Sequence, residues 1–143
     1  MKKTTLILST LILTFISVNA QETKWGFDKD HSKIQFDVAH MLISEVSGQF
    51  QEYEGTVVTS KEDFSDAKFD FSITVKSIDT DNEERDMHLR SADFFDVEKY
   101  PKITFKSKSM KKVGENQYEL IGNLTLHGVT KEVILDIKYG GTI

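Results

Sequence analysis

The chain has 143 residues, one proline, no cysteine and a formal net charge of −5 at pH 7. This length gives one domain with a sizeable core, which must be stable without disulfides. The lack of cysteine excludes thiol catalysis and Cys-ligated metal sites. An acidic chain is a poor candidate for nucleic-acid binding, which needs a basic stripe, and for electrostatic adhesion to anionic membranes. If the protein handles a lipid, it should do so by enclosing it.

The first 20 residues have the layout of a secretory signal peptide. Lys2 and Lys3 give a positive start, and residues 4–18 carry no charge. Residues 18–20, Val-Asn-Ala, offer modest side chains at the cleavage point. The apolar run is shorter than the roughly 20 residues that span a membrane, so an uncleaved anchor is the less favoured interpretation. We therefore expect export to the periplasm or beyond, and a mature domain over residues 21–143 with no integral membrane span.

Apolar and polar side chains alternate with a period of two in six later segments. These segments cover about residues 33–40, 46–50, 68–76, 102–106, 117–126 and 132–139. Such alternation is typical of half-buried antiparallel strands. Residues 113–116, Val-Gly-Glu-Asn, and the pair His127-Gly128 predict hairpin loops. Consecutive curved strands joined by short loops form a meander, which tends to close as a barrel.

One segment is not strand-like. Residues 80–86 open with capping residues and acids, and residues 87–90 continue with Met-His-Leu-Arg. This pattern predicts a helix of two or three turns, with Asp81 or Thr80 as its N-cap. A short helix between two barrel strands would lie across one mouth of the barrel.

Several motifs together resemble the YceI-like family, over nearly all of residues 27–139. The most specific is Arg85-Asp86-x-His88-Leu89-Arg90-Ser91, and the other matching stretches are residues 30–36, 40–50, 93–97, 100–105 and 122–131. The resemblance implies an all-β fold: a lipocalin-like antiparallel β-barrel of eight strands with one short helix. It also implies that the barrel encloses a polyisoprenoid chain, such as an isoprenoid quinone tail, and that the protein is exported.

The sequence departs from that pattern at its C-terminal end. About six strands are visible, and residues 140–143 read as the start of another connection. We expect the C-terminal strands of the family to be missing from this sequence. The other reading is that a second chain completes the barrel, as in a homodimer.

Candidate residues for chemistry are few. The four histidines, His31, His40, His88 and His127, fall on separate elements without metal-ligand spacing. No nucleophile elbow and no phosphate-binding glycine loop are present. We therefore predict no metal site, no catalytic residue and no cofactor beyond a bound polyisoprenoid or quinone lipid. His88 stands out, because Asp86 and two arginines surround it. It either receives a lipid headgroup or, as we favour, belongs to a buried network that fixes the helix.

Apolar side chains supply the main prediction. Nine of the ten phenylalanines follow residue 20, but periodicity alone cannot tell a packed core from a lined cavity. Gly48 and Gly122 on inward faces would leave room inside. The expected ligand-binding residues are Phe36, Val38, Phe50, Phe71, Ile73, His88, Leu89, Phe94, Phe105, Leu120, Leu124, Leu135 and Ile137. Binding would be driven by apolar burial, roughly 0.8 kcal/mol per CH₂, which suits a carrier or reservoir rather than an enzyme.

Two other functions remain open. One is an enzyme that acts on an apolar substrate through Asp86, His88 and Arg90. The other is an interaction protein that has a solid core and uses its acidic surface.

Overall fold

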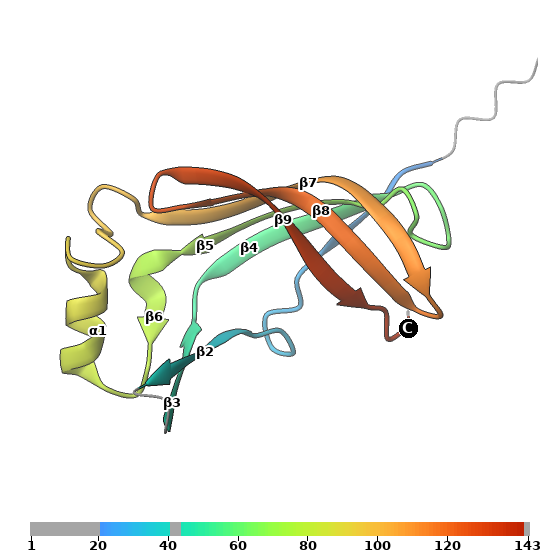
Figure 1. Ribbon diagram of the computed structural model, residues 1–143. Coiled ribbons are helices and arrows are strands. Elements are labelled where there is room, and N and C mark those ends of the chain that lie inside the picture. Colours follow the sequence, from blue (N-terminus) through green and yellow to red (C-terminus); the bar gives the residue numbers. More distant parts are fainter. Residues whose placement is uncertain (1–20, 41–43, 142–143) are drawn as a thin grey trace, which may run out of the picture.

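The computed structural model describes residues 21–40 and 44–141; the expected signal peptide lies outside this part. Within the described residues the chain forms nine strands, one 3₁₀ turn and one α-helix (Figure 1). The elements are β1 (Thr23–Gly26), β2 (Ile34–His40), β3 (Ser44–Phe50), β4 (Tyr53–Thr59), β5 (Lys68–Thr74), η1 (Val75–Ser77), β6 (Ile78–Asp79), α1 (Glu83–Arg90), β7 (Lys102–Gly114), β8 (Gln117–Leu126) and β9 (Val129–Lys138). Among these residues no helix is long and apolar enough to cross a membrane.

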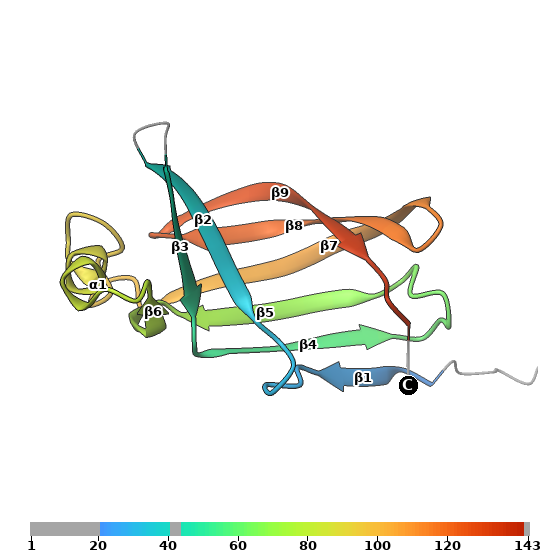
Figure 2. The same ribbon diagram turned by 90° about the horizontal axis from the view of Figure 1, so that it is seen from below.

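The strands form two antiparallel sheets. Six strands make the larger sheet in the order β1-β4-β5-β7-β8-β9, and three make the smaller one in the order β2-β3-β6. The larger sheet is strongly curved, and β2 and β3 cross its strands near the end that carries α1 (Figures 1 and 2). The predicted class, all-β with antiparallel sheets and one short helix, is confirmed.

Closure into a barrel is not observed in the described residues, because β1 and β9 remain the two edges of the larger sheet. The expected single meander is also wrong, since β2 and β3 leave for the smaller sheet and β1 pairs with β4. The count of about six strands was too low: each predicted segment lies on a strand, but β1, β4 and β6 were not predicted. The predicted strand over residues 68–76 ends at Thr74, and η1 begins at the next residue, Val75.

Both predicted hairpins are confirmed. A two-residue turn joins β7 to β8, with Asn116 at φ 55°. His127 and Gly128 join β8 to β9 with φ values of 48° and 73°, the double positive φ of a type I′ turn. Such turns match the right-handed twist of the flanking strands, so β8 and β9 pair in unbroken register from Gln117↔Lys138 to Leu126↔Val129.

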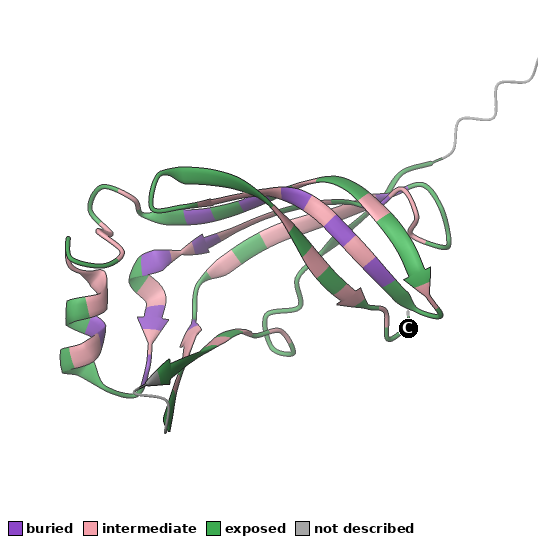
Figure 3. Cartoon of the chain, viewed as in Figure 1, coloured by how far each residue is buried: buried purple, intermediate pink, exposed green. Residues whose placement is uncertain are grey.

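The core lies where the small sheet covers the large one. Its buried residues come from β3, β5, η1, β6 and β7, and Figure 3 shows the buried positions gathering on these elements and on β8. They are Phe50, Ile73, Val75, Ile78 and Ile103. The pairing of Phe50 with Ile78 ties β3 to β6 and so holds the small sheet against this core. The opposite end of the large sheet has no such cover from β2, β3 and β6 (Figure 2).

The two inward glycines do not leave open space, contrary to our expectation. A methyl group on Gly122 would lie 2.5 Å from the Phe105 ring and 2.6 Å from the Lys106 carbonyl oxygen. At Gly48 a methyl group would collide with the Phe36 ring. Each glycine therefore makes room for an aromatic ring. Phe105 is fully buried and stacks on Phe71 at 5.0 Å with an interplanar angle of 19°.

Candidate functional site

The polar cluster near α1 is a network that fastens the helix to β6. The N-cap is Asn82, whose side chain accepts from the Arg85 N–H at 2.9 Å, so the prediction of Thr80 or Asp81 was wrong. Thr80 instead donates to the buried Asp86 carboxylate from its backbone N–H at 3.0 Å and its hydroxyl at 2.6 Å. The Thr80 hydroxyl also accepts from Arg85 Nε at 2.7 Å. These bonds explain why helix formation starts after residue 80.

Arg90 completes this network. Its Nε donates to the Lys76 carbonyl at 2.9 Å and its Nη2 to the Ile78 carbonyl at 2.5 Å. A guanidinium presents several donors in a rigid fork, which suits it to hold two carbonyls of one segment. Asp86 and the two arginines therefore form a network that fixes the helix, but the favoured prediction that His88 belongs to it as a buried residue is wrong, because its side chain is mostly exposed.

No described contact of the His88 side chain joins it to that network. Its side chain is 62% exposed, and its Nε2 lies 3.8 Å from Asp93 Oδ2. Its ring packs edge-to-face with that of Phe94, with ring centroids 4.8 Å apart. Asp86, His88 and Arg90 therefore have different partners, and none of their described contacts joins one to another. The arrangement offers no preassembled acid–base group for the enzyme alternative.

His31 and His127 are engaged locally, and the side chain of His40 lies outside the described part of the structure. His31 Nδ1 lies 2.9 Å from Asp28 Oδ2, and this hydrogen bond holds the pKa of Asp28 below its usual value. The His127 ring packs on Tyr100 with centroids 4.5 Å apart. In the described ranges, 21–40 and 44–141, no group of three or more His, Asp or Glu side chains is placed to hold a metal ion.

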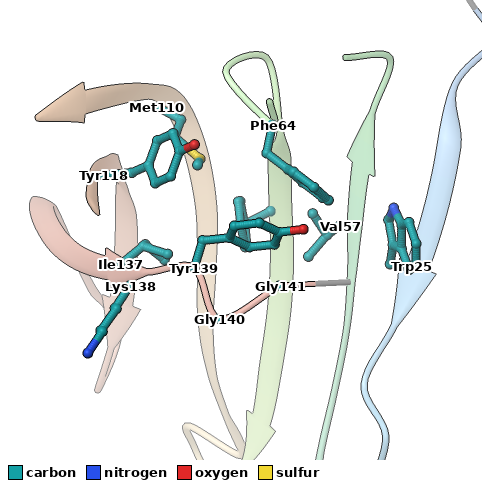
Figure 4. Close-up of a pocket in the computed structure, with 11 residues that line it drawn as sticks. Trp25, Val57, Phe64, Met110, Tyr118, Ile137, Lys138, Tyr139, Gly140 and Gly141 are labelled. Carbon is teal, nitrogen blue, oxygen red and sulfur yellow. The ribbon is translucent and has the colours of Figure 1, made fainter. Parts of the chain in front are cut away.

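An apolar pocket of about 400 Å³ lies at the end of the large sheet away from α1. Its lining, labelled in Figure 4 except for Phe69, consists of Trp25, Val57, Phe64, Phe69, Met110, Tyr118, Ile137, Lys138, Tyr139, Gly140 and Gly141. The strand register builds this lining, because Trp25, Val57 and Phe69 face one another across β1, β4 and β5. Tyr118 of β8 pairs in the same way with Ile137 of β9. The Lys138 amine points away from the other lining residues.

Three aromatic side chains, Trp25, Phe64 and Tyr139, meet at this pocket, and we call them the aromatic clasp. The Phe64 ring lies 5.1 Å from that of Tyr139 and 6.3 Å from that of Trp25, by centroids. Trp25 lies on one edge strand of the large sheet, and Tyr139 directly follows the other. The clasp therefore links the two edges through side chains.

Hydrogen bonds hold the β4–β5 loop, residues 60–67, that carries Phe64. The Asp66 carboxylate accepts from the Ser60 hydroxyl at 2.5 Å and from the Thr59 hydroxyl at 2.7 Å, and these bonds hold the pKa of Asp66 far below its usual value. Tyr118 donates to the Asp63 carbonyl at 3.0 Å, which joins the loop to β8. The Ser65 backbone N–H bonds the Asp63 carboxylate and lowers its pKa. The loop is thus an ordered wall of the pocket.

The sequence model of the YceI-like domain matches residues 25–143. The chain belongs to the YceI-like family. A UPF0312 protein of Pectobacterium atrosepticum is 40% identical over 143 residues, which cover 99% of this chain and 74% of that protein. Protein YceI of Salmonella newport is 38% identical over the same shares of the two chains.

Solved structures agree with this assignment. A Campylobacter jejuni YceI protein superposes with a TM-score of 0.65 at 35% identity, covering 80% of this chain and 67% of that one. Burkholderia cenocepacia BcnA shares the fold, with a TM-score of 0.74 at 23% identity over 80% and 72% of the chains. So does a Saccharophagus degradans domain, described as polyisoprenoid binding and implicated in plant cell wall breakdown, with a TM-score of 0.52 at 18% identity over 73% and 58%.

The residues predicted to line the ligand site fall into several groups in this YceI-like chain. Ile137 lines the pocket, Leu135 is half-buried two residues before it, and Phe105 and Leu120 are buried within the large sheet. The core near α1 takes in Phe36, Phe50, Phe71, Ile73, Leu89 and Leu124. Val38 and Phe94 are more than half exposed, as is the side chain of His88. For all of the residues predicted to line the site, contact with a ligand stays a prediction.

Sequence reasoning missed most of the pocket. Phe69, Tyr118 and Tyr139 lay within the alternating pattern but were not chosen as lining. Trp25 and Phe64 stand outside the six predicted strands, and the period-two pattern has no signal for them. The signal that remained was composition: a lone tryptophan and a phenylalanine inside an otherwise polar loop.

Proposed function

We propose that this YceI-like protein is an exported carrier or reservoir that encloses a long apolar lipid, a polyisoprenoid or an isoprenoid quinone. The observation that carries the proposal is the pocket at the aromatic clasp, whose lining side chains are mostly apolar. Membership of the family supports it, as does the description of the Saccharophagus relative in fold as polyisoprenoid binding. Export is proposed from the signal-like residues 1–20.

The size of the pocket indicates how such a lipid would sit. A volume of about 400 Å³ is near the lower end of the range of about 300–1,000 Å³ for ligand pockets. The pocket would therefore hold one segment of a long chain, and the rest would follow the apolar face of the curved sheet. Leu135 and Val133 continue that face along β9, with Phe71 and Leu124 nearer to the core. In this proposal the curved sheet is part of a lipocalin-like barrel around the chain.

Binding of this kind needs no reacting group. Each buried CH₂ contributes roughly 0.8 kcal/mol, so a chain of many carbons binds with few polar contacts. The rival enzyme reading requires Asp86, His88 and Arg90 to act together, yet Asp86 is bonded to Thr80 and Arg90 to the Lys76 and Ile78 carbonyls. We therefore propose that the protein is not an enzyme.

Trp25 makes a direct test possible, because it is the only tryptophan in the chain and lines the pocket. The experiment titrates the purified protein with prenols of increasing length and follows Trp25 fluorescence. We expect a saturable change, with affinity that rises with chain length. Val57→Asp places a charge in the pocket wall and should weaken binding by more than about tenfold, which corresponds to about 1.4 kcal/mol.

Val113→Asp is the matched control, because Val113 is exposed at the end of β7 and does not line the pocket. It should bind prenols like the wild-type protein. Equal binding by the two aspartate variants would show that the ligand binds somewhere other than this pocket. No fluorescence change and no thermal stabilisation by any prenol would reject the lipid-binding proposal itself.

A further inference from the structure

Phe64 has a backbone conformation that a phenylalanine rarely adopts. Its φ is 57°, in the left-handed region, where a side chain crowds its own backbone. Two turn bonds hold it there, from the Phe64 N–H to the Lys61 carbonyl at 3.2 Å and from the Ala67 N–H to the Phe64 carbonyl at 3.0 Å. Bulky residues in this region persist only where surrounding structure imposes them, and such sites gather at ligand clamps and switches.

The contacts around the loop show what imposes this conformation. Asp66 bonds Thr59 and Ser60 at the start of the loop, and Tyr118 holds the Asp63 carbonyl, next to Phe64 in sequence. The loop is therefore fixed at both sides of Phe64. The ring is directed onto Tyr139 and Trp25, over the pocket (Figure 4).

This placement puts the ring where the two edges of the large sheet face each other. β1 and β9 have no backbone pairing with one another among the described residues, and the Phe64 ring contacts a residue from each side. A ligand that reaches the pocket at this end of the sheet meets Phe64. The Phe64 backbone is held by the loop bonds, so any displacement of the ring larger than a side-chain rotation requires the loop to move.

We propose that Phe64 is a gate that controls how fast an uncharged apolar ligand enters and leaves the pocket. This proposal rests on the lipid-binding function and adds its regulation. Passage requires residues 60–67 to swing away, which breaks the Asp66 bonds and releases the left-handed backbone. The loop also carries Glu62, Asp63 and Asp66 against one lysine, so it disfavours an anionic headgroup at the entrance.

A residue that acts as a gate and a residue that only contacts the bound ligand, as a wall of the pocket does, affect the rate constants of binding differently. Loss of a wall contact raises the dissociation rate constant and leaves association nearly unchanged, which is the usual effect of interface mutations. Loss of a gate lowers the barrier in both directions, so the two rate constants rise together. The ratio of these rate constants, the Kd, then changes little.

The test uses the full chain and N-phenyl-1-naphthylamine, an uncharged apolar probe, in stopped-flow experiments. Energy transfer from Trp25 reports probe that has reached this pocket. We expect Phe64→Ala to raise both rate constants by about tenfold or more; the lost ring contact adds only to the dissociation rate constant, so Kd rises by a smaller factor than either rate constant. Asp66→Asn keeps the ring but weakens the loop bonds, and should raise both rate constants by a smaller factor. Met87→Ala, which removes an exposed apolar side chain on α1 outside the pocket, is the control and should leave them unchanged.

The outcomes separate the two proposals. If the wild type binds the probe and Phe64→Ala changes only the dissociation rate constant, Phe64 is a wall and the gate is refuted. The gate is also refuted if Phe64→Ala, shown to be folded by circular dichroism, has wild-type kinetics. If the wild type neither binds the probe nor transfers energy to it, lipid binding at this pocket fails, and the gate fails with it.

Discussion

Substitution of Gly122 by alanine tests the packing beneath the curved sheet. Gly122 is buried on β8, and an added methyl group would lie 2.5 Å from Phe105 Cζ and 2.6 Å from the Lys106 carbonyl oxygen. Neither neighbour can retreat easily, because Phe105 is fully buried and Lys106 is held within β7. Alanine in place of glycine normally gains about 0.4–1 kcal/mol through the unfolded chain. Overpacking costs about 1–3 kcal/mol, so we expect a net loss of about 1–2 kcal/mol.

Gly26→Ala is the matched control. Gly26 lies on β1, and a methyl group there would meet nothing within 4 Å. This variant should be as stable as the wild type or slightly more so. Urea titration by circular dichroism measures both, with an unchanged m-value required before the midpoints are compared. For a domain of about 120 residues the expected loss lowers Tm by about 3–10 °C.

A double variant checks the cause. Phe105→Leu removes the ring atoms nearest to Gly122, so Gly122→Ala should cost about 1 kcal/mol less in that background than in the wild type. A Gly122→Ala protein as stable as Gly26→Ala would refute the reasoning. So would equal costs of Gly122→Ala in the two backgrounds.

Three further changes test the polar networks. Asp86→Ala leaves the Thr80 N–H and hydroxyl without their acceptor and should lower the free energy of unfolding by about 2–3 kcal/mol in urea titration; a loss below about 0.5 kcal/mol would contradict the network. Tyr118→Phe removes the bond to the Asp63 carbonyl and should cost about 0.5–1.5 kcal/mol by the same assay, whereas an unchanged midpoint would show that the loop does not need it. The pKa values of Asp63 and Asp66 are lowered in the folded state, so their stabilising effect is complete above the unfolded pKa of about 4 and is lost as pH falls through the folded values. Tm should therefore stay level from pH 7 to 5 and fall below about pH 4, less steeply in Asp66→Asn; equal slopes would contradict this.

Local chemistry made part of the fold predictable. The type I′ turn at His127-Gly128 and the alternation along β8 and β9 depend on neighbouring residues, so the hairpin follows from sequence. The helix was predicted at the right place, but its start was not. Thr80 and Asn82 are both good capping residues, and only the hydrogen bond from the Thr80 hydroxyl to the Asp86 carboxylate decides between them.

Long-range pairing explains what was missed. β1 has four exposed residues and no alternation of burial, and it exists as a strand because it pairs with β4. The attachment of β6 to β3 in the smaller sheet depends on two residue pairs, which no local pattern encodes. The glycine prediction failed for a related reason, since the space at Gly122 is taken by Phe105 from the adjacent strand. The pocket was missed mainly because Trp25 and Phe64 lie outside the predicted strands.

The central claim is that this YceI-like protein encloses an apolar lipid. Native mass spectrometry of the protein, expressed from Met1 in a bacterial host and purified without detergent, tests it most directly. We predict a mass excess that organic solvent releases as a long-chain isoprenoid species, and that Val57→Asp reduces relative to Val113→Asp. A protein of bare polypeptide mass, which also takes up no prenol when incubated with it, would contradict the claim.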